Sequence, residues 1–258
     1  MSNEKLALAI SPTDRARAAA RKIAGAHDWV PLDQADKVIV FGGDGFLLQT
    51  LHQMLDLNHM VPVYGLNLGT VGFLMNIWED GDDVLRRLEK AMPFDVLPLC
   101  MTATTMSGQR VSYPAINEVS LLRETRQTAK LEISVNDHVR IPELVCDGVL
   151  IATPAGSTAY NLSANGPILP LGCGMLALTP ISPFRPRRWK GAILPESTRI
   201  HLRVLEPGKR PVSAVADQKE IRDIRDIQIE IDPLRRLTLL FDPGYSLDER
   251  IADEQFIV

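Results

Sequence analysis

Cysteine and histidine are scarce in this sequence. Cys100, Cys146 and Cys173 lie far apart and include no C-x-x-C spacing, and the five histidines form no H-x-x-x-H or Cys/His cluster. This pattern argues against a disulfide framework and against a zinc site, and it suits a reducing compartment. We therefore expect no metal site built from a cluster of the chain's own side chains.

Long apolar runs and a strong excess of one charge are also missing. No run of about 18 apolar residues occurs, so no transmembrane span is expected. The N-terminal stretch becomes charged at Asp14 and Arg15 and lacks the core of a signal peptide. The net charge of −4 creates no general attraction to nucleic acid or anionic membranes. The sequence thus predicts a cytoplasmic protein with neither nucleic acid nor a membrane as a partner.

The N-terminal third alternates apolar strands with amphipathic helices, which favours an open α/β layer with a mostly parallel sheet. Apolar residues make up 45% of the 258 positions, enough for one large domain or two modest ones. The expected strands cover residues 5–10, 38–41 and 61–64, and the expected helices cover 14–25, the segment after 43, and 80–91.

The character changes near Pro93–Pro98. Between 98 and 243 the sequence shows short strands with period-two alternation, namely "KLEISVND", "RIHLRV", "DIQIEID" and "RLTLLF". Turn residues separate them, which is typical of antiparallel sheets. We predict an α/β domain over 1–97, a β-rich domain over 98–244, and a helix in the final segment 245–258.

A Gly-Gly-Asp-Gly turn at 42–45 follows the second strand and opens a helix. The amides of Gly42, Gly43 and Gly45 lie at a helix N-terminus, where an anionic oxygen is favoured. The lysine of a Walker A loop is absent. Asp44 should repel a phosphate, and it could merely cap the helix.

A second glycine loop, "GLNLGTVGFL" at 65–74, follows the third strand. Ligands bind beyond the carboxyl ends of strands in open α/β sheets, so two glycine loops at that edge indicate a cleft. An ordinary loop that closes onto the core is the alternative.

Polar residues interrupt an apolar run at Asn117 and Glu118. Adjacent strand residues point to opposite faces, so one of the pair is expected to be buried or to face a cleft. A buried amide or carboxylate needs a partner, which a ligand hydroxyl or a metal can supply. A strand edge in contact with water explains the pair equally well.

The segment at 145–170, "VCDGVLIATPAGSTAYNLSANGPILP", combines Asp147, hydroxyls and an aromatic ring. Such groups can hold a ribose and stack on a base. Alternatively, Ser157 or Thr158 is a helix N-cap and Tyr160 packs in the core.

Taken together, "GGDG", "GLNLGTVGFL", "NEVSL" and "DGVLIATPAGSTAYNLSANGPI" resemble the NAD kinase family in order and spacing, over roughly residues 38–195. "GGDG" alone would be shared with diacylglycerol and sphingosine kinases and loosely with phosphofructokinases. The Gly-Ser-Thr-Ala-Tyr segment separates NAD kinases from those relatives.

The resemblance implies phosphoryl transfer from ATP, or from polyphosphate, to the 2′-hydroxyl of the adenosine ribose of NAD. It implies that Asp44 is the general base and that the terminal helix returns to the first domain. A divalent cation, Mg²⁺ above all, should accompany ATP, and a homodimer or homotetramer is expected.

The resemblance also assigns contacts to individual residues. Gly45 should lie against NAD, Asn117 and Glu118 near its adenine side, and Asp147 at its nicotinamide end. The remaining implied dinucleotide contacts are Thr158, Ala159, Tyr160, Ser163 and, by a looser match, Gln218. The phosphate-side loops contain Gly42, Gly43, Gly69 and Thr70.

The sequence departs from the family at two positions on the helix after the turn. Gln49 stands where many members carry a basic residue, and Phe46 replaces the usual threonine. The basic stretch at 185–190, with Arg185, Arg187, Arg188 and Lys190, can bind ATP or polyphosphate or can be a solvated loop. A lipid kinase and a non-catalytic dinucleotide sensor remain the alternative functions.

Overall fold

The computed structural model describes residues 4–70 and 72–244. These residues divide into two units, one formed by 4–96 with 235–244 and the other by 97–234. No helix within the described ranges is long and apolar enough to cross a membrane.

The first unit contains a mostly parallel sheet with the strand order β1-β2-β3-β18-β5, and β4 pairs with β3. The strands are β1 (Leu6–Ile10), β2 (Lys37–Gly42), β3 (Val63–Asn67), β4 (Asn76–Ile77), β5 (Met92–Val96) and β18 (Leu237–Phe241). Within this sheet β5 alone runs antiparallel to its neighbour, β18. The mostly parallel sheet confirms the predicted fold class of this part.

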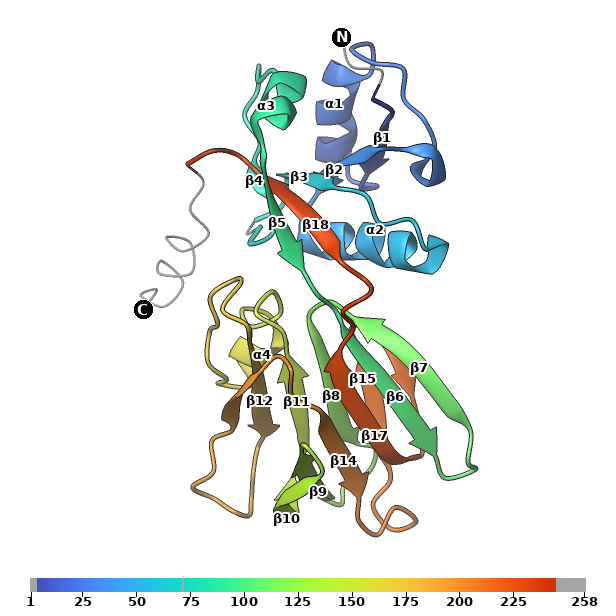
Figure 1. The fold of residues 1–258 in the computed structure, drawn as a ribbon, viewed down its shortest axis with the longest axis vertical. Helices are drawn as coiled ribbons and strands as arrows, with labels where there is room; N and C mark the ends of the chain where they lie inside the picture. The colour runs from blue at the N-terminus through green and yellow to red at the C-terminus, as the bar shows by residue number, and fades with distance from the viewer. Residues whose placement is uncertain (1–3, 71, 245–258) are drawn as a thin grey trace. The chain divides into compact units, whose positions relative to one another are not determined.

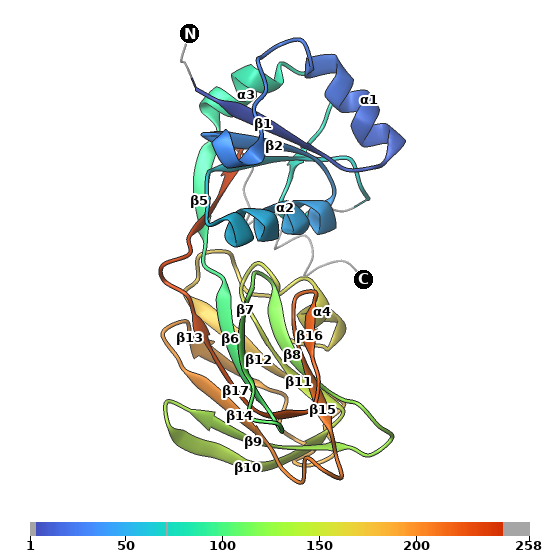
Figure 2. The ribbon, with the colours of Figure 1, turned by 90° about the vertical axis from the view of Figure 1, so that its right-hand side faces the viewer.

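Helices cover both faces of this sheet. They are α1 (Asp14–Ile23), α2 (Asp44–Leu57) and α3 (Val84–Lys90), with a 3₁₀ turn η1 (Leu32–Gln34). Figures 1 and 2 show α1 and α3 on one face and α2 on the other. Leu47, Leu51 and Met54 of α2 are almost completely buried. Apolar burial on two faces therefore holds β2, and the turn that follows it, in place.

The structure corrects one part of the predicted domain division. The strand "RLTLLF" was expected in the β-rich domain, but β18 pairs with β3 and β5 of the first sheet. Period-two alternation marks this segment as a strand without identifying its partner, because pairing depends on long-range packing. The predicted terminal helix at 245–258 lies outside the described residues.

The second unit contains two six-stranded antiparallel sheets. The first has the order β10-β9-β14-β17-β6-β7, with strands β6 (Leu99–Thr105), β7 (Arg110–Ala115), β9 (Ala129–Val135), β10 (His138–Cys146), β14 (Ile200–Val204) and β17 (Ile224–Ile231). The second has the order β13-β12-β11-β8-β15-β16, with strands β8 (Glu118–Arg123), β11 (Gly148–Ala152), β12 (Met175–Ile181), β13 (Ala192–Pro195), β15 (Val212–Ala216) and β16 (Lys219–Ile221).

The two sheets of this unit share one apolar core. Met101 of β6, Ile133 of β9 and Leu121 of β8 belong to the same buried cluster. A short helix, α4 (Tyr160–Ser163), packs with Leu150 of β11 in a second cluster. Burial on both faces explains why β11 is apolar throughout, and it fixes the segment that follows this strand.

Candidate active site

The Gly-Gly-Asp-Gly turn connects the end of β2 to the start of α2. Gly43 is the N-cap in extended conformation and provides no side-chain cap, while Asp44 is the first helical residue. The Asp44 carboxylate instead accepts hydrogen bonds from the amides of Phe73, at 2.8 Å, and Leu74, at 3.1 Å. Asp44 is therefore not merely a helix cap, because its carboxylate binds the second glycine loop.

The two glycine loops lie against each other at the backbone. The amide of Leu68 donates to the Gly42 carbonyl at 2.6 Å. A Cβ on Gly69 would lie 3.5 Å from the Cα of Gly43. Gly72 has a φ of +124°, and a Cβ there would lie 2.4 Å from the Asn67 side chain. The positive φ and this close approach require glycine at position 72, whereas the contact between Gly43 and Gly69 is of ordinary van der Waals length.

Two predicted contact residues in the glycine loops are exposed: Gly45, which was expected to lie against NAD, and Thr70, which was expected on the phosphate side. A Cβ on Gly45 would meet no atom within 4 Å. Of the two departures from the family, Gln49 is exposed on α2 and Phe46 is half-buried. A Cβ on Gly42 would come within 3.0 Å of Phe46, so this ring covers the back of the turn.

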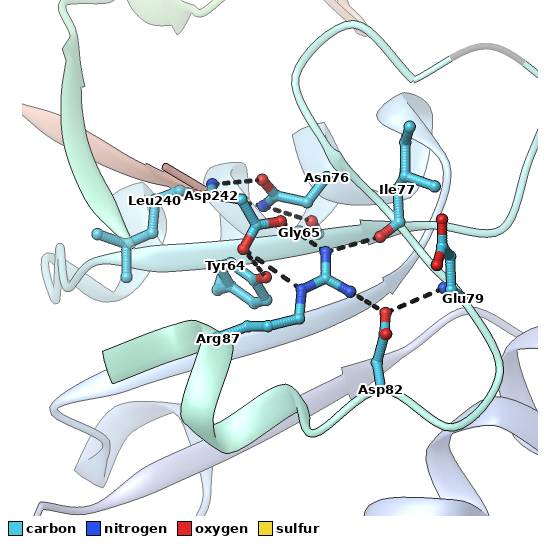
Figure 3. Close-up of polar contacts among 9 residues, drawn as sticks. All are labelled: Tyr64, Gly65, Asn76, Ile77, Glu79, Asp82, Arg87, Leu240 and Asp242. Atoms are coloured by element: carbon cyan, nitrogen blue, oxygen red, sulfur yellow. Dashed lines mark hydrogen bonds and ion pairs between the residues drawn. The ribbon is translucent and has the colours of Figure 1, made fainter. Parts of the chain in front are cut away.

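The loop that binds Asp44 ends at β4, where Asn76 anchors it. The Asn76 side-chain amide donates to the Gly65 carbonyl at 3.0 Å and to the Leu240 carbonyl at 2.9 Å, and its oxygen accepts from the Asp242 amide at 2.9 Å (Figure 3). One fully buried side chain thus joins β3, β4 and the end of β18.

Asp242 continues this network through its carboxylate. It accepts a hydrogen bond from the Tyr64 hydroxyl at 2.7 Å and pairs with the Arg87 guanidinium at 2.5 Å (Figure 3). Arg87 also pairs with Asp82 and donates to the Ile77 carbonyl. Burial and the Asp242 carboxylate raise the pKa of Tyr64 well above its usual range, so the phenol stays protonated. The members of this network are far apart along the chain, and no local sequence pattern identifies them.

In the second unit, Asn117 and Glu118 lie at the start of β8, where their backbone amides hydrogen-bond to Asp217. The Asp217 carboxylate accepts hydrogen bonds from the amides of Ile116 at 2.6 Å, Asn117 at 3.0 Å and Glu118 at 3.1 Å. Asp217 occupies the turn between β15 and β16, next to the predicted Gln218, which is exposed. Sequence reasoning missed Asp217, although an aspartate in a short turn often binds backbone amides.

Two polar atoms of this pair are buried without a partner. Within the described chain, the Asn117 Oδ1 and Glu118 Oε2 atoms have no hydrogen-bond partner. Burial raises the pKa of Glu118 to about 7, and the charge of Asp217 contributes to this shift. Burial and Glu118 raise the pKa of Tyr160. Unpaired buried polar atoms are costly, and a hydrogen bond from a ligand or a water molecule would remove this cost.

The loop before α4 packs directly on Asn117. A Cβ on Gly156 would lie 2.2 Å from the Asn117 carbonyl oxygen, so only glycine fits there. The Thr153 hydroxyl donates to the Ile116 carbonyl at 2.7 Å. These contacts tie the loop to the start of β8.

Hydroxyl and amide side chains within the loop have different roles. Ser157 is buried and hydrogen-bonds to both the carbonyl and the amide of Leu169. Asn161 is buried and accepts from the Thr179 hydroxyl at 2.7 Å. These two side chains hold the loop. The predicted contacts Thr158, Ala159 and Tyr160 are half-buried, and Ser163 is exposed.

Asp147 and the basic stretch lie elsewhere in the second unit. The Arg123 guanidinium donates to the Asp147 carboxylate at 2.6 Å, an ion pair that the sequence did not predict. Arg185 and Arg187 lie over the ring of exposed Phe184, 5.4 and 5.0 Å from its centroid. The stacked arginines support neither the ligand-binding nor the solvated interpretation over the other.

Two solved structures share this fold. Yeast NADH kinase complexed with NADH aligns with a TM-score of 0.81 at 20% identity, over 97% of this chain and 86% of that chain. An NAD kinase from Archaeoglobus fulgidus in complex with ATP aligns with a TM-score of 0.77 at 22% identity, over 97% of this chain and 98% of that chain. These similarities confirm the predicted fold class, an α/β part combined with a β-rich part.

Comparison of sequences is more specific. The family model described as ATP-NAD kinase C-terminal domain matches residues 116–232. The chain is 60% identical over 259 residues to a protein from Rhizorhabdus wittichii named NAD kinase, with 100% of both chains covered. It is 59% identical over 256 residues to one from Zymomonas mobilis subsp. mobilis, also named NAD kinase, with 99% of both covered. This identity over the full length shows that the chain belongs to the NAD kinase family.

Proposed function

We propose that this NAD kinase transfers the terminal phosphoryl group of ATP to the 2′-hydroxyl of the adenosine ribose of NAD, with Asp44 as the general base. The observation that carries the proposal is the fixed carboxylate of Asp44 at the N-terminus of α2. The amides of Phe73 and Leu74, in the second glycine loop, orient this carboxylate. Phosphoryl transfer requires alignment, charge neutralisation and an acceptor for the hydroxyl proton. The turn supplies the acceptor together with helix amides that favour an anion.

The dinucleotide is bound in this proposal by the residues that the sequence indicated in the second unit. Asn117 and Glu118 contact the adenine side, and Tyr160 stacks on a ring with Thr158 and Ala159 beside it. The unpaired Asn117 and Glu118 oxygens support this assignment, since a polar ligand would satisfy them. Gly45, Asp147, Ser163 and Gln218 are further proposed contacts. Gly42, Gly43, Gly69 and Thr70 are proposed on the phosphate side.

A divalent cation, in our proposal Mg²⁺, accompanies ATP. Mg²⁺ is usually held largely by substrate phosphates and waters, so the phosphates of ATP would supply most of the ligands of this cation. When bound, the cation would neutralise part of the negative charge on the phosphates.

The test of the base compares Asp44→Asn with Asp56→Asn, a matched change at an exposed position on the same helix. NADP formation from NAD, ATP and Mg²⁺ should fall by about 10²–10⁴-fold in Asp44→Asn, with NAD binding retained. Asp56→Asn should keep the wild-type rate. Full turnover by Asp44→Asn would show that Asp44 is not the base.

Donor and acceptor assays also separate the alternatives. Replacing ATP with inorganic polyphosphate tests the second donor. Phosphorylation of a diacylglycerol or sphingosine in place of NAD would indicate a lipid kinase. NAD binding without NADP formation from either donor would indicate a dinucleotide sensor.

We further infer a cytoplasmic enzyme that assembles as a homodimer or homotetramer, with its two domains meeting in sequence near residue 97. The family resemblance supports the assembly, and light scattering coupled to gel filtration measures it. A monomeric mass for active enzyme would overturn this assignment.

A further inference from the structure

The turn that contains Asp217 presents a carboxylate to the backbone rather than to solvent. Its two oxygens accept three amide hydrogen bonds from consecutive residues, Ile116, Asn117 and Glu118. The Asp217 amide returns a hydrogen bond to the Glu118 carbonyl at 3.1 Å. Asp217 has a φ of 49°, a conformation in which its side chain and backbone both reach the start of β8.

The residues held in this way carry the two unpaired buried oxygens, Asn117 Oδ1 and Glu118 Oε2. Three hydrogen bonds thus order a segment whose two buried side-chain oxygens have no partner among the described residues. Leaving such oxygens unpaired is costly unless a ligand hydrogen-bonds to them. The second observation is electrostatic. The negative charge of Asp217 disfavours a second negative charge on the buried Glu118 carboxyl, so Glu118 retains its proton more strongly.

We propose that Asp217 is a positioning residue for dinucleotide binding. Asp217 orients Asn117 and Glu118, and it keeps the Glu118 carboxyl protonated as a hydrogen-bond donor. The inference rests on the proposed function, since it takes the dinucleotide as the ligand of this pair. The pair then offers one acceptor, the Asn117 oxygen, beside one donor, the Glu118 hydroxyl. Such a pair recognises a group with an adjacent N–H and an acceptor atom.

The surroundings of Glu118 are consistent with this protonation. Burial and the charge of Asp217 raise the pKa of Glu118 to about 7. Tyr160 of α4 also interacts with Glu118, and its own raised pKa keeps the phenol neutral. Lys219, two residues after Asp217, lies over the Tyr113 ring at 5.4 Å.

The experiment measures NAD affinity by calorimetry between pH 5.5 and 8.5, using the full-length protein. For wild type we expect the affinity to fall as pH rises through about 7. Asp217→Asn keeps the size of the side chain and one acceptor oxygen but removes the charge, so the midpoint should move down by at least ~0.5 pH unit. Asp217→Ala removes the amide contacts as well and should raise the Kd about tenfold at pH 6, a loss equal to roughly 1.4 kcal/mol.

Two further variants complete the design. Glu118→Gln carries a neutral amide that still donates, so its NAD affinity should no longer change across this pH range. Asp232→Asn is the matched control, because the Asp232 carboxylate also accepts a backbone amide, that of Leu234, outside the proposed site. It should leave the wild-type pH profile in place.

The outcomes separate this inference from the function on which it rests. An unchanged midpoint in Asp217→Asn, with NAD binding and NADP formation by wild type intact, would overturn the positioning role alone. A flat wild-type profile would overturn the protonation of Glu118 in the same way. Failure of the wild type to bind NAD at all would overturn the proposed function and, with it, this inference.

Discussion

Gly156, in the second unit, lies where no side chain fits. Gly156 lies so close to β8 that a Cβ would come within 2.2 Å of the Asn117 carbonyl oxygen. Such an atom cannot be accommodated by a rotamer change, because the neighbour is backbone. A side chain at position 156 would therefore have to displace the backbone at Asn117.

We expect Gly156→Ala to lower the free energy of unfolding by about 1–3 kcal/mol, as overpacking does, and to weaken NAD binding. Gly208→Ala is the matched control, since a Cβ on Gly208 meets no atom within 4 Å. Thermal denaturation and NAD titration of both variants check this. Equal stability of the two variants would contradict it.

Glu118 makes the stability of the unliganded protein depend on pH. Its pKa is raised from 4.5 to about 7 in the folded state, so between these values the folded protein binds more protons than the unfolded chain. The free energy of unfolding therefore falls as pH rises through this window and stays lower above it.

We expect Glu118→Gln to match wild type near pH 5 and to exceed it above pH 7 by about 1–3 kcal/mol. Denaturant unfolding without NAD at both pH values measures the difference. The prediction is wrong if the two proteins remain equally stable at pH 8.

At the scale of secondary-structure elements, Asn76 is the link that closes the first sheet around the second glycine loop. Its side chain makes three hydrogen bonds, to Gly65 and Leu240 carbonyls and from the Asp242 amide. Because the side chain is fully buried, water cannot replace these bonds when it is removed.

Asn76→Ala should lower the free energy of unfolding by about 3 kcal/mol, since it leaves buried backbone groups unsatisfied. It should also reduce kcat, because the same loop provides the amides that orient Asp44. Gln53→Ala, an equivalent truncation at an exposed position of α2, is the control and should change neither quantity. If folded Asn76→Ala kept the wild-type kcat, the anchoring of this loop by Asn76 would not be needed for catalysis.

At the scale of the whole molecule, the first unit is discontinuous in sequence. β18 lies between β3 and β5 in the sheet, yet it follows the entire second unit along the chain. Without β18, β5 loses the strand with which it pairs and β3 loses a neighbour. Unsatisfied edges of this kind destabilise a sheet and expose it to aggregation.

We therefore expect a fragment of residues 1–96 to be unfolded or aggregated, and a fragment of residues 97–234 to fold alone. Circular dichroism and amide dispersion in NMR spectra measure both. Joining residues 235–258 to the first fragment through a Gly/Ser linker should restore its structure. A well-folded 1–96 fragment would show that β18 is dispensable.

The sequence by itself determined the local structure and the identity of the chemistry. Apolar periodicity of 3.6 and of two residues is a local property, so α2, the parallel strands and the antiparallel strands were predictable close to their observed positions. The GGDG turn and the Gly-Ser-Thr-Ala-Tyr segment identified the family because both are contiguous motifs. Asn117 and Glu118 were recognisable as polar residues within an apolar run.

Only the tertiary structure decided which distant residues support these motifs. Asp217 is separated from Asn117 by 100 positions and Asp242 from Asn76 by 166, and no local pattern marks either pairing. The same holds for β18, whose alternation fits any antiparallel or parallel neighbour. The physical reason is that periodicity specifies which side of an element is buried, whereas the partner across that side is selected by the packing of the whole chain.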